Sequence, residues 1–70
     1  MKTNQVMQFC DNGIEYKVIK YYGEINPYRI YKCFYAPDRY GYLTKHRKMI
    51  VKYANLNSCF WWFVQNNLGN

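Results

Sequence analysis

Few residues of this 70-residue chain are of the types that perform catalysis or bind metal ions. Its one histidine, His46, lies in the basic run TKHRK, where no carboxylate nearby in the sequence could orient the ring. Cys10, Cys33 and Cys59 have spacings that match no zinc site, and the chain has no glycine-rich phosphate loop. We therefore expect a protein that is not an enzyme and that uses no cofactor and no metal.

The basic residues are unevenly distributed along the chain, whose net charge is +6. Residues 1–38 hold five Lys/Arg and all four acids, which gives +1. Residues 39–70 hold five Lys/Arg and no acid, which gives +5. A one-sided basic charge of this kind attracts a polyanion, such as nucleic acid, anionic lipid or an acidic protein surface.

The hydrophobic pattern predicts three antiparallel strands. Residues 14–22 and 28–36 are rich in β-branched and aromatic residues, and residues 42–54 form a third segment that could break near His46. The alternation slips at Ile19-Lys20, which suggests a bulge or a strong twist there. Residues 37–41, PDRYG, predict a reverse turn with Pro37 at its second position and Asp38 at its third.

The last segment, residues 55–68, predicts a helix. Asn55 is the expected N-cap, Asn57 a rival one, and Gly69 the C-terminal stop. The fold class is therefore α+β: one small domain with a three-stranded, or four-stranded, antiparallel sheet and a C-terminal α-helix packed on one face. Residues 1–13 form an N-terminal segment of mixed character. The predicted core comprises Ile14, Tyr16, Val18, Ile30, Phe34, Met49, Val51, Leu56, Cys59, Phe60, Phe63 and Val64.

Trp61 and Trp62 fall outside the apolar face of this predicted helix, at about 100° per residue. Three environments are open to them: the N-terminal segment and a curled sheet, a homodimer or partner-protein interface, or a membrane surface or nucleic-acid bases. In the second case the partner or dimer interface would comprise Trp61, Trp62, Tyr31 and Tyr35.

Tyrosines and cations interleave along the second and third predicted strands. A sheet face bearing both could lay its cations along phosphates, and a β-ribbon fits the major groove of DNA. The alternative is equally consistent with the sequence: the lysines keep an exposed sheet face in contact with water, the tyrosines pack, and neither binds a ligand. The candidate nucleic-acid-binding residues are Arg29, Lys32, Lys45, Arg47 and Lys48.

The expected order of three antiparallel strands and one helix, over residues 14–68, is similar in element order to the sheet-reading DNA-binding domains of some integrases and AP2-type factors. The resemblance implies a non-catalytic nucleic-acid-binding module. The alternative is a protein-binding regulator or inhibitor that docks through exposed Trp and Tyr, as a homodimer or on another protein. The small size and the abundance of Asn, Lys, Tyr and Ile suit a phage or mobile-element protein. With no signal peptide, no transmembrane span and three reduced thiols expected, we predict a cytoplasmic location.

Overall fold

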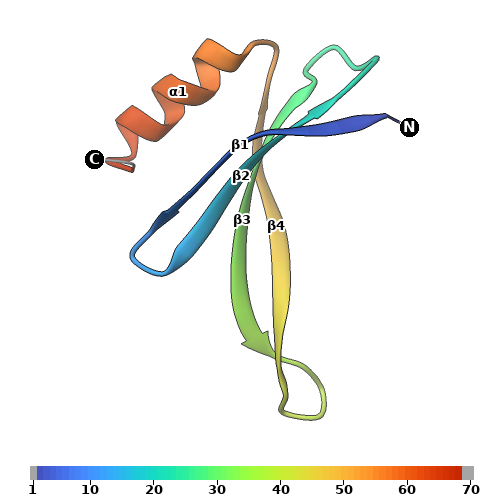
Figure 1. Ribbon diagram of the computed structural model, residues 1–70, viewed down its shortest axis with the longest axis vertical. Helices are drawn as coiled ribbons and strands as arrows, with labels where there is room; N and C mark the ends of the chain where they lie inside the picture. The colour runs from blue at the N-terminus through green and yellow to red at the C-terminus, as the bar shows by residue number, and fades with distance from the viewer. Residues whose placement is uncertain (1, 69–70) are drawn as a thin grey trace.

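Four antiparallel strands and one C-terminal helix make up the computed structural model, which describes residues 2–68 (Figure 1). The strands are β1 (Thr3–Asp11), β2 (Ile14–Tyr21), β3 (Tyr28–Pro37) and β4 (Leu43–Tyr53), and the helix is α1 (Leu56–Gln65). The strands lie side by side in the order β1-β2-β3-β4. The predicted α+β fold is confirmed in its four-stranded form, because residues of the N-terminal segment form β1.

The turn between β1 and β2 is made by Asn12 and Gly13, two residue types that favour turns. Asn12 and Gly13 both have positive φ, 50° and 79°, which two-residue hairpin turns of type I′ require. Asn and Gly tolerate this left-handed region better than other residues. The turn therefore fixes the register in which Asp11 pairs with Ile14.

The turn between β3 and β4 starts two residues later than predicted. Asp38 occupies the first position, since its carbonyl accepts from Gly41 N at 3.1 Å and its carboxylate from Tyr40 N at 2.8 Å. Gly41, with φ of 83°, follows in the left-handed region. Pro37 instead ends β3, paired with Leu43. The aspartate side chain decides this position because it mimics a backbone acceptor.

Two irregularities interrupt the strand pairing, and neither lies in β2. One extra residue, Val6, is inserted in β1, and another, Ile50, in β4. Of the two alternatives predicted at Ile19-Lys20, a bulge within β2 is absent, because both residues pair regularly with β3. The extra residue of the β1–β2 pair is Val6 on β1, inserted where Ile19 and Val18 face that strand. Val18 and Ile19 project from opposite faces of the sheet, and both are buried. The break in the apolar alternation therefore reflects burial on both faces.

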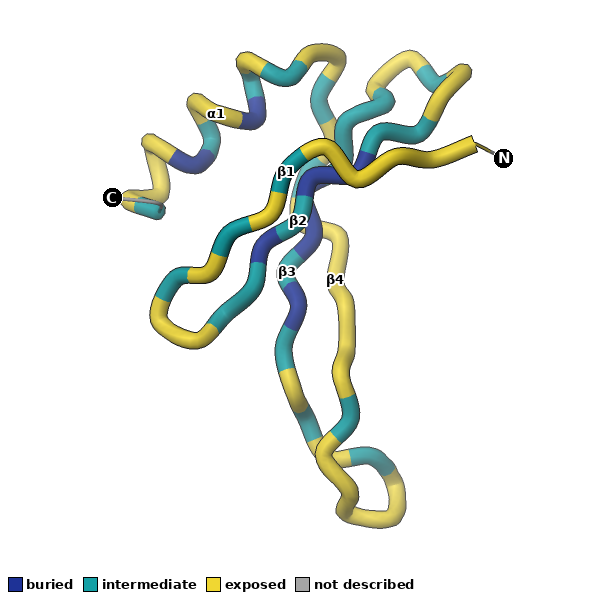
Figure 2. Tube along the Cα trace, viewed as in Figure 1, coloured by how far each residue is buried: buried dark blue, intermediate teal, exposed yellow. Residues whose placement is uncertain are grey.

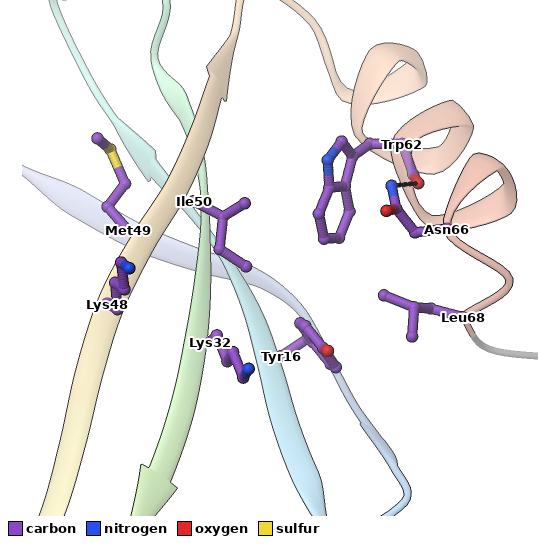
Figure 3. Close-up of a pocket in the computed structure, with 8 residues that line it drawn as sticks. All are labelled: Tyr16, Lys32, Lys48, Met49, Ile50, Trp62, Asn66 and Leu68. Atoms are coloured by element: carbon purple, nitrogen blue, oxygen red, sulfur yellow. Dashed lines mark hydrogen bonds between the residues drawn. The ribbon is translucent and has the colours of Figure 1, made fainter.

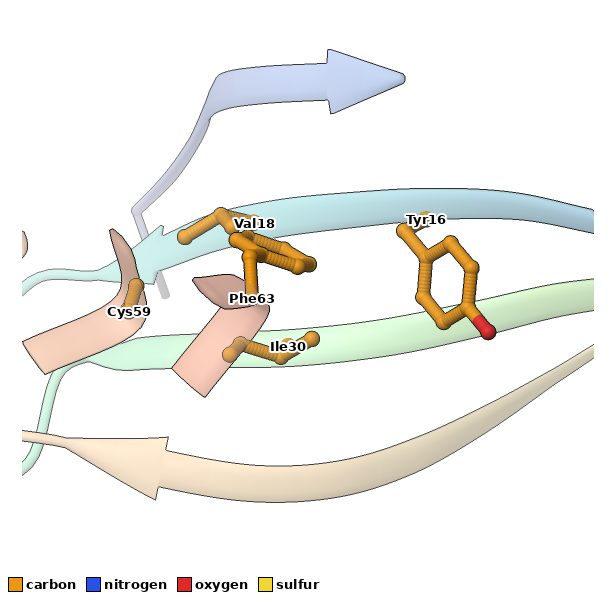
Figure 4. Packing of buried hydrophobic residues seen from close by; sticks show 5 residues of the cluster. All are labelled: Tyr16, Val18, Ile30, Cys59 and Phe63. Carbon is orange, nitrogen blue, oxygen red and sulfur yellow. The ribbon is translucent and has the colours of Figure 1, made fainter. Parts of the chain in front are cut away.

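The core lies between α1 and one face of the sheet, here called the helix face. It consists of Tyr16 and Val18 from β2, Ile30 from β3, and Cys59 and Phe63 from α1 (Figure 4). Phe9 of β1 meets the edge of the Phe63 ring, with the ring centroids 4.5 Å apart. Ile14, Val51 and Leu56 pack around this cluster, as do Met7, Tyr28, Tyr53, Trp62 and Leu68.

Four residues predicted to be in the core lie outside it. Phe60 and Val64 are exposed because α1 turns Trp62, not them, toward the sheet, where Tyr16 and Phe9 provide an aromatic surface. Met49 is exposed because the extra residue Ile50 reverses its direction relative to Val51. Phe34 stacks on His46 beyond the end of the helix-covered region.

The caps of α1 explain its length. The Asn55 side chain accepts a hydrogen bond from Ser58 N at 2.9 Å, as predicted for the N-cap. At the other end Asn67 adopts φ of 55°, and Leu68 N donates to Phe63 O at 2.9 Å. This is a Schellman ending, with Asn67 in the position that glycine commonly takes. The helix thus ends at Gln65, before the predicted stop at Gly69, which lies outside the described residues.

Candidate nucleic-acid interface

The hairpin of β3 and β4 extends beyond the rest of the sheet. The last pair between β2 and β3 joins Glu15 to Cys33, so residues 34–46 are paired only with one another. This segment, here called the arm, projects past the β1–β2 hairpin in Figure 1. Because it has no helix against it, its side chains reach solvent on both faces.

Three tyrosines on the arm are exposed. Tyr35, Tyr40 and Tyr42 have exposed fractions of 69%, 75% and 71%. Leu43 is exposed to the same degree beside them, and Arg39 lies within the turn. Of these residues, only Tyr35 was a predicted site residue. The others lie in or beside the predicted turn of a basic hairpin, and this position in the sequence indicates that they are exposed. The arm therefore presents flat aromatic rings next to positive charge.

Strand β4 is exposed along most of its length (Figure 2). Every residue from Lys45 to Ile50 is exposed, because β4 is an edge strand and α1 covers only its last residues. Lys45 and Arg47 project from the open face, the side of the sheet away from α1, whereas His46 and Lys48 project from the helix face. Positive charge thus surrounds this edge, which also hinders pairing with a strand of another chain.

The five predicted nucleic-acid-binding cations do not form one track. Arg29, Lys45 and Arg47 lie on the open face, and Lys32 and Lys48 on the helix face, where they pair directly across β3 and β4. Arg29 and Lys32 lie on opposite faces because they are three positions apart on β3. The extra residue Ile50 places Lys48, not Lys45 or Arg47, on the face of Lys32.

The five predicted cations also differ in whether a carboxylate of the chain lies close enough to neutralise their charge. Arg29 Nη2 donates to both carboxylate oxygens of Glu24, at 2.8 and 2.7 Å, and this hydrogen-bonded pair raises the pKa of the arginine. Lys45 Nζ lies 3.1 Å from Glu15 Oε1, and its hydrogen bond lowers the pKa of Glu15. Within residues 2–68, Lys32, Arg47 and Lys48 form no ion pair.

Tyr31 lies at the centre of a polar cluster on the open face. Its hydroxyl is 2.7 Å from that of Tyr21, the Arg47 guanidinium lies over its ring at 4.4 Å, and Arg29 lies over the Tyr21 ring at 3.9 Å. Burial favours a raised pKa for Tyr31, but hydrogen bonds with Tyr21 and Arg29 and the two arginine charges outweigh it and lower the pKa. The hydrogen bond between the two hydroxyls raises the pKa of Tyr21. This cluster orders Arg47 against the sheet.

The four residues predicted for a partner or dimer interface lie in different places. Trp61 is exposed on the outer side of α1, and Trp62 is half-buried against the core. Tyr31 is buried on the open face, with only 7% exposed, and Tyr35 is exposed on the arm. They therefore do not form one surface.

An open cleft of about 480 Å³ lies on the helix face, beneath the C-terminal end of α1 (Figure 3). Lys32 and Lys48 form part of its wall, with Tyr16 and Trp62 among the other lining residues. The sequence did not predict this grouping, because it depends on the strand register and on the rotation of α1.

Within residues 2–68, no three His, Cys, Asp or Glu side chains come together as a metal site would require. Cys10 is an exposed free thiol, and Cys33 and Cys59 are buried ones; burial raises the pKa of Cys59. No helix in this part of the chain has the length and apolar character needed to cross a membrane.

Comparison with known proteins gives no relative: no family model, curated protein or solved structure matches this chain.

Proposed function

We propose that this protein binds nucleic acid without catalysing a reaction, and that β4 and the arm are its contact surface. The observation that carries the proposal is the exposure of β4 from Lys45 to Ile50, with cations on both of its faces. Arg47 and Lys48 form no ion pair within residues 2–68, so both charges are available to phosphates. Binding to phosphates releases counterions, which supplies a large share of the affinity.

The arm adds a second kind of contact. Tyr35, Tyr40 and Tyr42 expose aromatic rings on which unpaired bases can stack, and such stacking contributes about 1–3 kcal/mol per base. Paired bases in a duplex cannot offer their faces in this way. We therefore expect single strands to bind more tightly than a duplex of the same length.

The phosphate contacts can be tested by the salt dependence of binding to a labelled oligonucleotide, measured by fluorescence anisotropy. The double change Arg47→Ala, Lys48→Ala should reduce the slope of log K against log salt by about 1.4 on a single strand. The control is Lys2→Ala, Lys20→Ala, which removes the same charge around Tyr22, at the other end of the sheet. Equal effects of the two double changes would mean that β4 is not the contact surface.

The stacking contacts can be tested separately. Tyr40→Ala, Tyr42→Ala should weaken single-strand binding at least about fivefold, whereas the exposed loop residue Tyr22 should be replaceable by Ala without effect. Binding of the unaltered protein weaker than about 10⁻⁴ M to both single strands and duplex at physiological salt would exclude the proposed function.

Protein binding is a second candidate, favoured by one observation. Phe60, Trp61 and Val64, exposed by 47%, 64% and 57%, form an apolar ridge on the outer side of α1. No charged residue lies between positions 55 and 68, although the whole chain carries +6. A second copy would meet least repulsion there, so the candidate is a homodimer. Light scattering should then show a dimer that Trp61→Ala converts to a monomer; a monomeric unaltered protein would remove this candidate.

A further inference from the structure

The cleft beneath α1 has the size and composition of a ligand site. Its volume, about 480 Å³, lies within the range of about 300–1,000 Å³ that is usual for small-molecule pockets. Its walls come from β2, β3, β4 and the end of α1. The inserted residue Ile50 lines it and also directs Lys48 to this side of the sheet. Bulges that redirect side chains are common beside functional sites.

The cleft holds two positive charges and no negative one. Lys32 and Lys48 are direct partners across β3 and β4, and like charges in that arrangement destabilise a sheet. None of the four acids of the chain lines the cleft. Two of them, Glu15 and Glu24, are paired with Lys17, Lys45 and Arg29. An anion bound between the two lysines would remove this repulsion and interact with both.

The rest of the cleft suits a flat, largely apolar group. Tyr16 and Trp62 form adjacent walls, with ring centroids 6.3 Å apart and planes tilted by 56°. Figure 3 shows both rings beside the space that the two lysines border. Ile50 and Leu68 complete the apolar lining. Asn66 Nδ2 donates to Trp62 O at 2.8 Å, which leaves the amide oxygen as an acceptor for an N–H group of a base, such as N3–H of thymine.

A planar ring joined to an anion is the chemistry of a nucleotide. We propose that the cleft binds one nucleotide of a single-stranded nucleic acid, with the base against Trp62 and Tyr16 and the phosphate between Lys32 and Lys48. This inference rests on the proposed function and adds to it a defined position for one unpaired base. A base in a duplex cannot reach the cleft without leaving its partner.

The two tryptophans allow a direct test. Trp61 is exposed on the outer side of α1, so Trp61→Phe leaves Trp62 as the only indole and makes its fluorescence report on the cleft. Titration of this variant with oligothymidylate should quench Trp62 emission to saturation. Duplex DNA and inorganic phosphate should not, because neither offers a free base to stack on the indole.

Charge variants in the same background then locate the phosphate. Lys32→Gln and Lys48→Gln should each weaken the quenching titration about tenfold, since each removes a charged partner of the phosphate. The matched control is Lys20→Gln, which removes one charge from β2 beside Tyr22, at the other end of the sheet, and should leave the titration nearly unchanged. Melting curves should show that the Lys32 and Lys48 variants remain folded without ligand.

The outcomes separate the cleft from the wider proposal. Oligonucleotide binding seen by anisotropy, without quenching of Trp62 or with equal effects of Lys20→Gln and Lys32→Gln, would overturn the cleft inference and leave the proposed function standing. Quenching by inorganic phosphate alone would also overturn it, because the site would then recognise only an anion. Absence of binding by anisotropy would overturn the proposed function and this inference with it.

Discussion

Phe60 and Phe63 are the same residue type, three positions apart on one helix, in different environments. Phe63 is buried against Val18, Ile30 and Phe9, whereas Phe60 is exposed on the outer side of α1. The helical periodicity alone placed both on the buried face. The rotation of α1 is decided by the aromatic contacts among Phe9, Tyr16, Trp62 and Phe63.

This difference predicts unequal costs of truncation. Phe63→Ala should lower the free energy of unfolding by about 3–5 kcal/mol, because it leaves a cavity in a small core. Phe60→Ala should cost much less, about 0.5 kcal/mol, since the ring is already half in solvent. Urea denaturation of the two variants makes the comparison, and similar midpoints would contradict the observed rotation of the helix.

At the scale of elements, α1 is held by its ends as well as by its core face. It has no acidic residue in its first turn and no basic residue in its last, so no charged side chain of the helix interacts favourably with its macrodipole. The hydrogen bonds of the Asn55 side chain and of the Schellman ending at Asn67 satisfy terminal backbone groups instead.

The N-cap can be tested by replacing Asn55 and Asn57, because the sequence alone does not decide which of these two asparagines caps the helix. Asn55→Ala should cost about 1 kcal/mol, because Ser58 N loses its acceptor. Asn57→Ala should cost little, since this residue lies exposed within the first turn. Thermal unfolding followed by circular dichroism gives both values, and a larger loss for Asn57→Ala would place the start of the helix two residues later.

At the scale of the whole molecule, the fold is thin and strongly twisted, with extents of 39 × 33 × 15 Å. One helix can cover only part of such a sheet, so the arm and the edge of β4 remain in solvent. The open face is nevertheless partly closed by its own side chains, because Ile19, Tyr31 and Cys33 are buried there. The molecule thus separates a helix-covered core from a basic projection.

The net charge of +6 gives a prediction for the molecule as a whole. Raising NaCl from about 50 to about 300 mM should increase the urea midpoint, because salt screens the repulsion among the excess cations. The ion pairs within residues 2–68, Lys17–Glu15, Arg29–Glu24 and Lys45–Glu15, are partly exposed and should oppose this effect only weakly. A fall in the urea midpoint would show that the ion pairs stabilise the fold by more free energy than the repulsion among the excess cations removes.

The sequence by itself determined the features that depend on neighbouring residues. The alternation in residues 14–21 and 28–37, the Asn12-Gly13 turn and the Asn55 cap all follow from local preferences of the backbone. The surplus of cations after position 38 is likewise a property of the sequence. These local signals were sufficient to predict the fold class and to suggest the type of ligand that we propose.

Only the tertiary structure decided which side chains meet. The single extra residue Ile50 reverses the direction of every β4 side chain before it relative to Val51, so it brings Lys48 beside Lys32 and directs Arg47 to the opposite face. Side chains alternate with a period of two along a strand, and one inserted residue exchanges the two faces. The rotation of α1 then sets Trp62 opposite the two lysines. Both effects depend on packing between segments far apart in the chain.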